Sequence, residues 1–332
     1  MKPLVILTGP TAVGKTNLSI GLAKRINGEI ISADSMQVYR KMDIGTAKIM
    51  PEEMDGVPHH LIDVLDPKEP FNVVLFKELA TKAMDEIYAR GRIPVIVGGT
   101  GFYIQAVLYD IHFNENDDDK SYRTYLEQLA EKHGNLCLHQ MLEKVDPASA
   151  KAIHYNNRKR VIRALEFYKE TGIPISEHNE KESKRISPYN FEYFVLNDAR
   201  SKLYDRIDRR IDIMVEQGLI EEVKALKDQG YTKDLVSMQG LGYKEILDYL
   251  DGVTSLDEAL YILKRDTRHF AKRQITWFKR EKEVTWVDKS EFTSEDTIMD
   301  FMLEQLRSKR SEEHTSELQS LEDLVCRLLL EK

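Results

Sequence analysis

The strongest chemical signal in this sequence is an eight-residue loop of the type that binds phosphate. Gly9, Pro10, Thr11, Ala12, Val13, Gly14, Lys15 and Thr16 match the pattern G-x-x-x-x-G-K-[ST]. The glycines let backbone N–H groups converge on phosphate oxygens, and the helix that follows adds the dipole of its N-terminus. Lys15 supplies positive charge and Thr16 a hydroxyl ligand for Mg²⁺. The loop predicts a phosphate-bearing ligand without specifying which one.

A second candidate group, Asp34, directly follows the apolar run EIISA (29–33). If this run is a strand of a parallel sheet, Asp34 lies at the carboxyl edge, where open α/β sheets bind ligands. There its carboxylate could accept a proton from an acceptor nucleophile. The alternative is that Asp34 caps the turn formed by DSMQVY. Its neighbours Ser35, Met36 and Gln37 offer hydrogen bonds and apolar contacts suited to a planar base.

The run PVIVGG (94–99) ends without an acidic residue and continues within GGTGFY (98–103). Enzymes that hydrolyse nucleotides with this type of loop usually carry a carboxylate at such a strand end, where it organises Mg²⁺ and water. The missing carboxylate disfavours ordinary nucleotide hydrolysis. A small-molecule transferase or kinase is favoured instead.

Short apolar runs alternate with helical patterns around these groups. Strands are predicted at 3–8, 29–33, 94–99, 191–197 and 284–288, and helices at 16–26, 73–90, 200–229, 241–250, 256–282 and 294–308. The alternation indicates an α/β fold, in which helices flank a parallel sheet that carries the phosphate loop. Between ENDDD (115–119) and KESKRISP (181–188) only helices are predicted, at 120–133, 135–143, 147–152 and 156–171. We therefore expect a core of 1–112 and 191–309 with an inserted all-helical domain at 113–190.

The composition excludes several classes of protein. Hydrophobic residues make up 42% and charged residues 31%, as in soluble proteins with a full core. No apolar stretch approaches the roughly 18 uninterrupted residues of a membrane span, so we expect no membrane association. Cys137 and Cys326 form neither a metal-binding spacing nor a disulfide framework. That usage fits the reducing cytoplasm.

Two clusters of basic residues qualify the net charge of −8, which by itself argues against a nucleic-acid partner. Residues 264–282 hold eight Lys and Arg, and Lys264, Arg268 and Lys272 share one helix face. NNRKRVIR (156–163) is the second cluster. Either cluster alone could be a solvated helix face. Together with a phosphate loop, in an otherwise acidic chain, they indicate RNA phosphate as a partner.

Seven stretches, in order along residues 1–288, resemble the tRNA dimethylallyltransferase family (isopentenyl-tRNA transferases) of the bacterial type. They are GPTAVGKT (9–16), ISADSMQVYRKMDIGTAK (31–48), PHHLID (58–63), GGTGFY (98–103), RALEFY (163–168), QGLGYKE (239–245) and AKRQITWFKR (271–280). The resemblance implies transfer of a dimethylallyl group from dimethylallyl diphosphate to the exocyclic amine of the adenine immediately 3′ of the anticodon. It implies pyrophosphate as the second product, Mg²⁺ as cofactor and the tRNA anticodon stem-loop as partner. The helical insertion would contact that stem-loop.

The resemblance also assigns roles to individual residues. Gly9 to Thr16 would hold the diphosphate, with Thr11 near the bridging oxygen as a catalytic residue, and Arg210 matches an arginine that faces the diphosphate. Asp34 would be the general base, and Asp34, Ser35, Met36 and Gln37 would line the flipped adenine. The remaining RNA contacts would be Thr100, Arg123, Lys159, Arg160, Val161, Ile162 and Arg163. The family usually has a glutamine where this chain has Lys159.

Three alternatives remain open at the level of sequence. A prenyl transfer to free AMP, ADP or ATP would need no clamp for a stem-loop, which the helical insertion of about 75 residues could provide. A small-molecule kinase would use Asp34 as a base toward a hydroxyl and would consume ATP. A non-catalytic RNA-binding protein would leave Lys15 and Asp34 without a purpose. We expect a monomer, although no sequence feature fixes the oligomeric state.

The last 23 residues, 310–332, carry three basic and six acidic side chains. RSEEHTSELQS (310–320) looks like the in-frame translation of a sequencing-adapter oligonucleotide, so we interpret the segment as foreign to the native protein. The alternative is an ordinary charged helix at the C-terminal end, which LEDLVCRLLLEK (321–332) could form. The functional interpretation does not use this segment.

Overall fold

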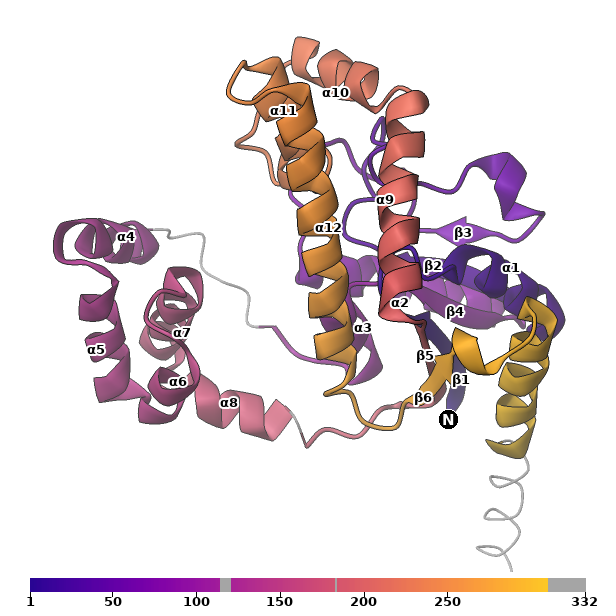
Figure 1. The fold of residues 1–332 in the computed structure, drawn as a ribbon. Coiled ribbons are helices and arrows are strands. Elements are labelled where there is room, and N and C mark those ends of the chain that lie inside the picture. The colour runs from indigo at the N-terminus through magenta and orange to yellow at the C-terminus, as the bar shows by residue number, and fades with distance from the viewer. Residues whose placement is uncertain (114–120, 183, 310–332) are drawn as a thin grey trace, which may run out of the picture. The chain divides into compact units, whose positions relative to one another are not determined.

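The core of the protein is one parallel sheet. The computed structural model describes residues 1–113, 121–182 and 184–309, and it contains a six-stranded sheet in the order β3-β2-β4-β1-β5-β6 (Figure 1). The strands are β1 (Lys2–Thr8), β2 (Gly28–Ala33), β3 (His59–His60), β4 (Ile93–Gly98), β5 (Tyr189–Asn197) and β6 (Thr285–Asp288). Every pairing is parallel, and the central strands are buried on both faces as their continuous apolar runs predict. The predicted α/β class is confirmed.

Two helices cover the N-terminal half of the sheet. Helix α1 (Lys15–Ile26) packs on β1, β2 and β4, and α2 (Val73–Ala89) packs on β2 and β4. The chain moves outward from β1 to β2 and then back to β4, so right-handed crossovers place α1 and α2 on opposite faces. Helix α2 begins after Asn72, whose side-chain oxygen accepts hydrogen bonds from the amides of Val74 (2.9 Å) and Leu75 (3.0 Å).

The strand register brings the ends of four neighbouring strands to one edge. Ala33 of β2 and Thr8 of β1 both pair with Gly98 of β4, and Thr8 also pairs with Val195 of β5. The Thr8 hydroxyl donates to the carbonyl oxygen of Gly98 at 2.7 Å, which fastens β1 to β4 at this level. The residues that leave the sheet here are therefore Asp34, Gly99, Gly9 and Asp198, in the order of their strands.

The rest of this unit is helical. It comprises α3 (Gly101–Leu108), α9 (Arg200–Glu216), α10 (Leu219–Asp228), α11 (Tyr243–Leu250), α12 (Leu256–Phe278) and a helix across 295–309. Figure 1 shows α9 and α12 running side by side, and they pack on each other. We predicted one helix across 200–229, which was wrong: Gly218, with φ of +103°, separates α9 from α10. Short 3₁₀ turns lie at Pro51–Met54, Ser237–Gln239 and Lys289–Glu291.

A second compact unit lies within Tyr109–Ser187, and the first unit consists of Met1–Leu108 and the described residues from Pro188 onward. Our predicted boundaries at 112/113 and 190/191 fall within four residues of this division. The described helices of the second unit are α4 (Ser121–His133), α5 (Asn135–Val145), α6 (Pro147–Ala152), α7 (Arg158–Thr171) and α8 (Ile175–Glu182). Their core is formed by Leu126, Ala130, Leu138, Leu142, Ala150, Val161, Ile162, Ala164 and Leu165.

Two further findings bear on the sequence expectations. Among the helices of the described segments, none has the length and apolarity needed to cross a membrane. Cys137 is a free, partly buried thiol. Cys326 and the whole of the segment 310–332 lie outside the described residues, as does the acidic run 115–119.

Candidate active site

The predicted phosphate loop, residues 9–16 (the P-loop from here on), connects β1 to α1 with the backbone that such a loop needs. Gly9 has φ of +146° and Gly14 has φ of +93°, which residues with a side chain rarely adopt. A Cβ on Gly9 would also lie 2.5 Å from the carbonyl oxygen of Leu196. The ammonium of Lys15 donates to the carbonyls of Gly9 and Pro10, both at 2.9 Å, so it lies across the loop. Thr16 is solvent-exposed in the first turn of α1.

The charge of Lys15 is finely balanced. Burial and, to a smaller extent, the positive charge of Arg210 lower its pKa to about 7, while the carboxylate of Asp34 acts in the opposite direction. These three groups, which come from α1, α9 and the end of β2, therefore share one electrostatic environment. A negatively charged ligand bound there would favour the protonated form of Lys15.

A second arginine of α9 supports the outer side of the P-loop. Arg206 Nε donates to the carbonyl of Ala12 at 3.0 Å, and its guanidinium pairs with the buried Asp198 at 2.7 Å. Lys289 adds a contact of 3.4 Å to the carbonyl of Val13. None of these three residues was predicted. The spacing of Arg206 and Arg210, four residues apart on a helix that follows the strand-end carboxylate Asp198, was a usable signal.

Asp34 serves the turn and still presents a second oxygen. Its Oδ1 accepts hydrogen bonds from the amides of Met36 (2.8 Å) and Gln37 (3.4 Å), so the capping alternative describes this atom correctly. Oδ2 makes no hydrogen bond with the residues that the structure describes. The carboxylate is half-buried at the edge of the sheet, next to the end of β4. One oxygen therefore fixes the geometry while the other is available for proton transfer.

The residues that follow Asp34 are held in place by their surroundings. Gln37 Nε2 donates to the carbonyls of Ala47 (3.2 Å) and Thr46 (3.4 Å), while its Oε1 accepts from Ser32 Oγ at 3.1 Å. The amide of Gln37 is thus engaged by the protein, which we did not expect. Met36 packs against Gly240, where a Cβ would lie 2.4 Å from the Met36 methyl carbon. Ser35, which is half-buried, lies between Asp34 and Met36 in the turn.

A carboxylate that sequence reasoning missed anchors the segment 43–48. Glu222 of α10 accepts hydrogen bonds from three successive amides, those of Asp43, Ile44 and Gly45, at 2.8–3.1 Å. It also accepts from the hydroxyl of Tyr243 at 2.7 Å. This segment supplies the two carbonyls that hold Gln37, so α10 and α11 fix the turn after Asp34 indirectly. No single-sequence pattern identifies Glu222 among the other acidic residues of the chain.

Thr100 lies at the end of β4, beside Asp34 in the sheet. Its amide donates to the carbonyl of Ala33 at 3.3 Å, and its own carbonyl accepts from Tyr103 at the start of α3 at 2.9 Å. Burial, together with the smaller effects of Tyr39 and the carboxylate of Asp34, raises the pKa of Tyr103 to about 12. The Tyr103 hydroxyl therefore stays neutral beside the carboxylate at physiological pH.

A cavity of about 720 Å³ opens beside the P-loop, at Thr16, and its lining includes Gln37, Arg210 and Glu222 among the residues described above. Its polar wall includes Thr16, Ser32, Gln37 and Arg210, and its apolar wall includes Ile30, Ile44, Ile62, Ile213 and Met214. The cavity therefore joins Thr16 and Arg210 to apolar side chains, while Asp34 and Thr100 lie at the neighbouring strand ends of the same sheet edge.

Comparisons with known proteins identify the family of this chain. The model of the IPP transferase family matches residues 37–281, and that of the isopentenyl transferases matches residues 2–65. The tRNA dimethylallyltransferase of Lachnoclostridium phytofermentans is 62% identical over 309 residues, which is 93% of this chain and 99% of the relative. That of Acetivibrio thermocellus is 52% identical over 299 residues, or 90% and 96%. The chain belongs to the IPP transferase family.

Solved structures of the family have the same fold. The full-length tRNA isopentenylpyrophosphate transferase of Bacillus halodurans matches with a TM-score of 0.71 and 50% identity, covering 95% of this chain and all of that one. A eukaryotic dimethylallyltransferase acting on tRNA matches with a TM-score of 0.76 and 31% identity, over 87% and 74%.

The helical unit within Tyr109–Ser187 contains the other residues that we predicted to contact RNA. Lys159 and Arg160 are exposed on the first turn of α7, and Arg163 is half-buried there. Val161 and Ile162 are 0% and 3% exposed within the helical core, so their side chains do not support the predicted RNA contact, which stays a prediction for these two positions. Helical spacing already places them on the apolar face of α7.

Arg123 of α4 is not free to bind RNA with its whole guanidinium. Its Nε and one terminal nitrogen donate to the two carboxylate oxygens of Glu166 at 2.8 and 2.7 Å, which joins α4 to α7. The side chain remains 48% exposed. A fork-to-fork pair of this kind fixes the orientation of the arginine and leaves the other terminal nitrogen for a further acceptor.

The basic stretch of α12 divides into two groups in this family member. Lys264 pairs with Asp212 at 2.5 Å and Arg268 with Asp208 at 2.6 Å, so these two cations bind α12 to α9. The face that we predicted for RNA is therefore partly an interhelical contact. Further along the chain the cations are exposed. They are Lys272 and Arg273 on α12, and Lys279 and Arg280 directly after its last residue.

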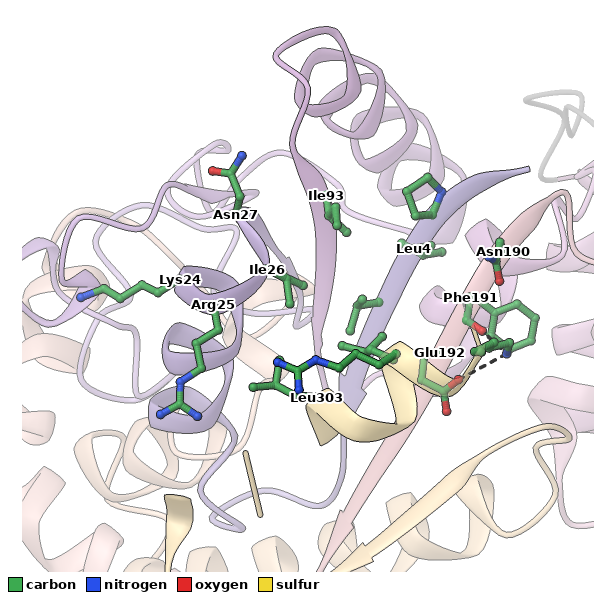
Figure 2. Close-up of a pocket in the computed structure, with 15 residues that line it drawn as sticks. Leu4, Lys24, Arg25, Ile26, Asn27, Ile93, Asn190, Phe191, Glu192 and Leu303 are labelled. Carbon is green, nitrogen blue, oxygen red and sulfur yellow. Dashed lines mark hydrogen bonds and ion pairs between the residues drawn. The ribbon is translucent and has the colours of Figure 1, made fainter. Parts of the chain in front are cut away.

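Figure 2 shows a second cavity, of about 400 Å³, at the opposite edge of the sheet. It lies between the end of α1, the amino halves of β1 and β5, and the helix across 295–309. Of its cations, Arg25 is 3.7 Å from both Asp296 and Asp300, Lys24 pairs with Asp55, and Lys309 is 3.3 Å from Glu192. These three have acidic partners, which leaves Arg307 as a single further cation among the residues that line the cavity, whereas a diphosphate site needs several convergent ones.

Proposed function

We propose that this chain transfers a dimethylallyl group from dimethylallyl diphosphate to a tRNA adenine, at the exocyclic amine of the base immediately 3′ of the anticodon. The observation that carries the proposal is the shared sheet edge. A P-loop suited to diphosphate and a carboxylate with one available oxygen meet there, next to a cavity with apolar walls. Membership of the IPP transferase family supports the same reaction.

The donor half of the site fits an allylic diphosphate. The P-loop amides, Lys15 and Arg210 would stabilise the negative charge that grows on the diphosphate as the C1–O bond breaks. The hydroxyl of Thr16 fits a Mg²⁺ ion, because Mg²⁺ commonly takes one or two protein oxygens together with phosphate oxygens and water. No group of three or more His, Cys, Asp or Glu in the described residues could hold a metal by itself, so the diphosphate must contribute ligands. Bound Mg²⁺ would further neutralise the leaving diphosphate.

The acceptor half requires one proton transfer. The adenine nitrogen N6 attacks C1 of the dimethylallyl group, the C1–O bond breaks, and pyrophosphate leaves with the bonding electron pair. The amine becomes acidic as the C–N bond forms, so Oδ2 of Asp34 is basic enough to take its proton. Thr11 would lie near the bridging oxygen of the donor. Ser35, Met36 and Thr100 would border the extruded adenine, and a loop base costs less to unstack than a paired one.

Exposed cations in both units suit the RNA backbone. Lys159 and Arg160 on α7, with the free nitrogen of Arg123, would contact the stem-loop, as would the exposed cations of α12. We further propose that the protein works in the cytoplasm as a monomer. In light scattering without tRNA, we expect a single species with the mass of a monomer, and dilution should not change that mass.

The decisive experiment compares acceptors. The protein is incubated with dimethylallyl diphosphate labelled in the prenyl group and Mg²⁺, with tRNA, a matched tRNA whose base 3′ of the anticodon is guanine, or AMP. Label should appear only in the adenine-containing tRNA, with one pyrophosphate released per transfer. Label in AMP would indicate a cytokinin-type transferase. ATP consumption in the absence of prenyl donor would indicate a kinase.

A further inference from the structure

Gln274 of α12 is a buried polar side chain that joins two parts of the site. It is 6% exposed, its Oε1 accepts from the Thr11 amide at 2.8 Å, and its Nε2 donates to the Gly99 carbonyl at 3.0 Å. Thr11 belongs to the loop after β1, and Gly99 to the turn after β4 that leads into Thr100. Gln274, 263 residues away from Thr11, thus accepts a hydrogen bond from the loop that would hold the prenyl donor. It also donates a hydrogen bond to the turn that would border the acceptor base.

The glycines of the turn after β4 make room for α12. A Cβ on Gly99 would lie 2.1 Å from Gln274 Nε2, and a Cβ on Gly101 would lie 2.2 Å from the Trp277 ring. Trp277 follows Gln274 by three residues, so both side chains extend from one face of α12. The stretch AKRQITWFKR therefore docks against GGTGFY, and the packing leaves the Gln274 amide little freedom to rotate.

We propose that Gln274 is a positioning residue that sets the P-loop at Thr11 relative to the turn that carries Thr100, and so aligns the donor with the acceptor base. The inference rests on the proposed function. It differs from a packing role because it depends on the two hydrogen bonds rather than on the volume of the side chain. Binding of the diphosphate alone uses the other loop amides and Lys15, so it should depend little on Gln274. The transfer step, which needs both substrates aligned, should depend on it strongly.

Two substitutions separate the hydrogen bonds from the volume. Gln274→Met keeps the length of the side chain and loses both bonds. Gln274→Glu keeps the shape: when protonated, its carbonyl accepts from Thr11 and its hydroxyl donates to Gly99, but when ionised it faces the Gly99 carbonyl with a second acceptor. Gln105→Glu is the matched control, because Gln105 is a half-buried glutamine that donates to Glu281 and contacts neither the P-loop nor Gly99.

The first test measures kcat, the KM for dimethylallyl diphosphate and the Kd for inorganic pyrophosphate from about pH 8 to about pH 5. Each variant is expressed as a ratio to the wild type at the same pH, since the titratable groups near the two joined segments are present in all of them; these groups are Lys15, Asp34, Tyr103 and Glu281. We expect Gln274→Met to lower kcat by roughly 10²-fold at every pH, as for a reacting group misplaced by about 1 Å, with little change in pyrophosphate affinity. The kcat ratio of Gln274→Glu should rise as pH falls, because burial raises the pKa of a carboxyl. Gln105→Glu serves as the control for amide exchange and not for kcat, because its new carboxyl would lie beside Glu281, whose pKa burial raises to about 7.

Hydrogen exchange of the Thr11 amide provides a readout that needs no activity. Exchange should accelerate in Gln274→Met, and in Gln274→Glu at the higher pH only, while Gln105→Glu keeps the wild-type rate. A protected Thr11 amide in Gln274→Met, or a wild-type kcat in that variant, would overturn the proposal. A pH-independent ratio for a folded Gln274→Glu would do the same. If the wild type transfers no dimethylallyl group, the proposed function fails, and the exchange data alone then decide whether Gln274 orders the loop.

Discussion

Replacement of Asp34 by asparagine separates the two tasks that the structure gives to this carboxylate. The asparagine carbonyl can occupy the place of Oδ1 and accept from the Met36 amide at 2.8 Å, so the turn should persist. The position of Oδ2 then carries an NH₂ group, which cannot take a proton. We expect kcat to fall by about 10²- to 10⁴-fold, the usual contribution of a general base, while the melting temperature and tRNA affinity change little.

Replacement by alanine is the companion variant. It removes the base and also both hydrogen bonds to the turn, so kcat should fall at least as far as in Asp34→Asn. Loss of a hydrogen bond to a partly exposed charged group should in addition cost about 1–2 kcal/mol of folding stability. Thermal and urea unfolding would measure that difference between the two variants.

The Asp34→Asn variant should also change the pH dependence of donor binding. The carboxylate raises the pKa of Lys15 against the effects of burial and Arg210. Without it, that pKa falls below about 7, and Lys15 becomes protonated only at lower pH. The affinity for pyrophosphate, which needs the charged lysine, should therefore begin to decline at a lower pH than in the wild type.

Single-turnover transfer of labelled dimethylallyl groups, with tRNA in excess, is the appropriate assay because it reports the chemical step alone. Wild-type turnover in Asp34→Asn combined with lost stability in Asp34→Ala would refute the reasoning. Asp34 would then be a turn residue only, and the base would have to be sought elsewhere at the sheet edge.

Three further predictions follow from the described contacts. Lys15→Ala should weaken pyrophosphate binding and slow transfer, and ATP should not compete with dimethylallyl diphosphate in calorimetry with either protein; competition would favour a nucleotide enzyme. Burial alone would raise the pKa of the Glu29 carboxyl, but Arg90 and His60 have the larger effect and lower it to about 2. The contribution of Glu29 to folding stability is therefore present above about pH 4.5 and is lost as pH falls toward 2. Glu29→Gln should accordingly reduce the free energy of unfolding by roughly 3 kcal/mol near pH 7 and by much less near pH 2, as measured by urea unfolding. Arg160→Ala should weaken tRNA binding uniformly among tRNAs and reduce its salt dependence by about one phosphate contact, without changing pyrophosphate affinity; an unchanged salt slope would remove Arg160 from the interface.

The sheet and the P-loop could be predicted because their signals are local. Buried parallel strands appear as uninterrupted apolar runs, and the P-loop is read from eight consecutive residues between a strand and a helix. Asp34 could be placed at the sheet edge for the same reason, since it directly follows such a run. Gly218 was a sequence signal for the break between α9 and α10. Because the apolar periodicity continues on both sides of Gly218, we did not use that signal.

The groups that hold the site together could not be predicted, because they act across long separations in sequence. Gln274 contacts Thr11, and Glu222 contacts the amides of 43–45, through tertiary packing that no local pattern encodes. The two-residue strand β3 is likewise defined by its neighbour β2 rather than by its own composition. Val161 and Ile162 are a different case. Their helical periodicity indicated burial, and the motif-based assignment overrode it.

The electrostatics of the site link donor binding to proton balance. With a pKa of about 7, Lys15 is roughly half neutral near pH 7 in the absence of ligand, and its ammonium is directed at loop carbonyls. A diphosphate brings negative charge to the same loop and favours the protonated lysine, so donor binding takes up part of a proton. In the proposed reaction, transfer would then release one proton from the adenine amine toward Asp34, the group whose charge also supports that of Lys15. Departure of pyrophosphate returns the lysine to its half-protonated state. A lysine that becomes fully protonated only when phosphate is bound would discriminate against neutral prenyl alcohols. The groups responsible come from three separate elements, which the parallel sheet brings to a single edge.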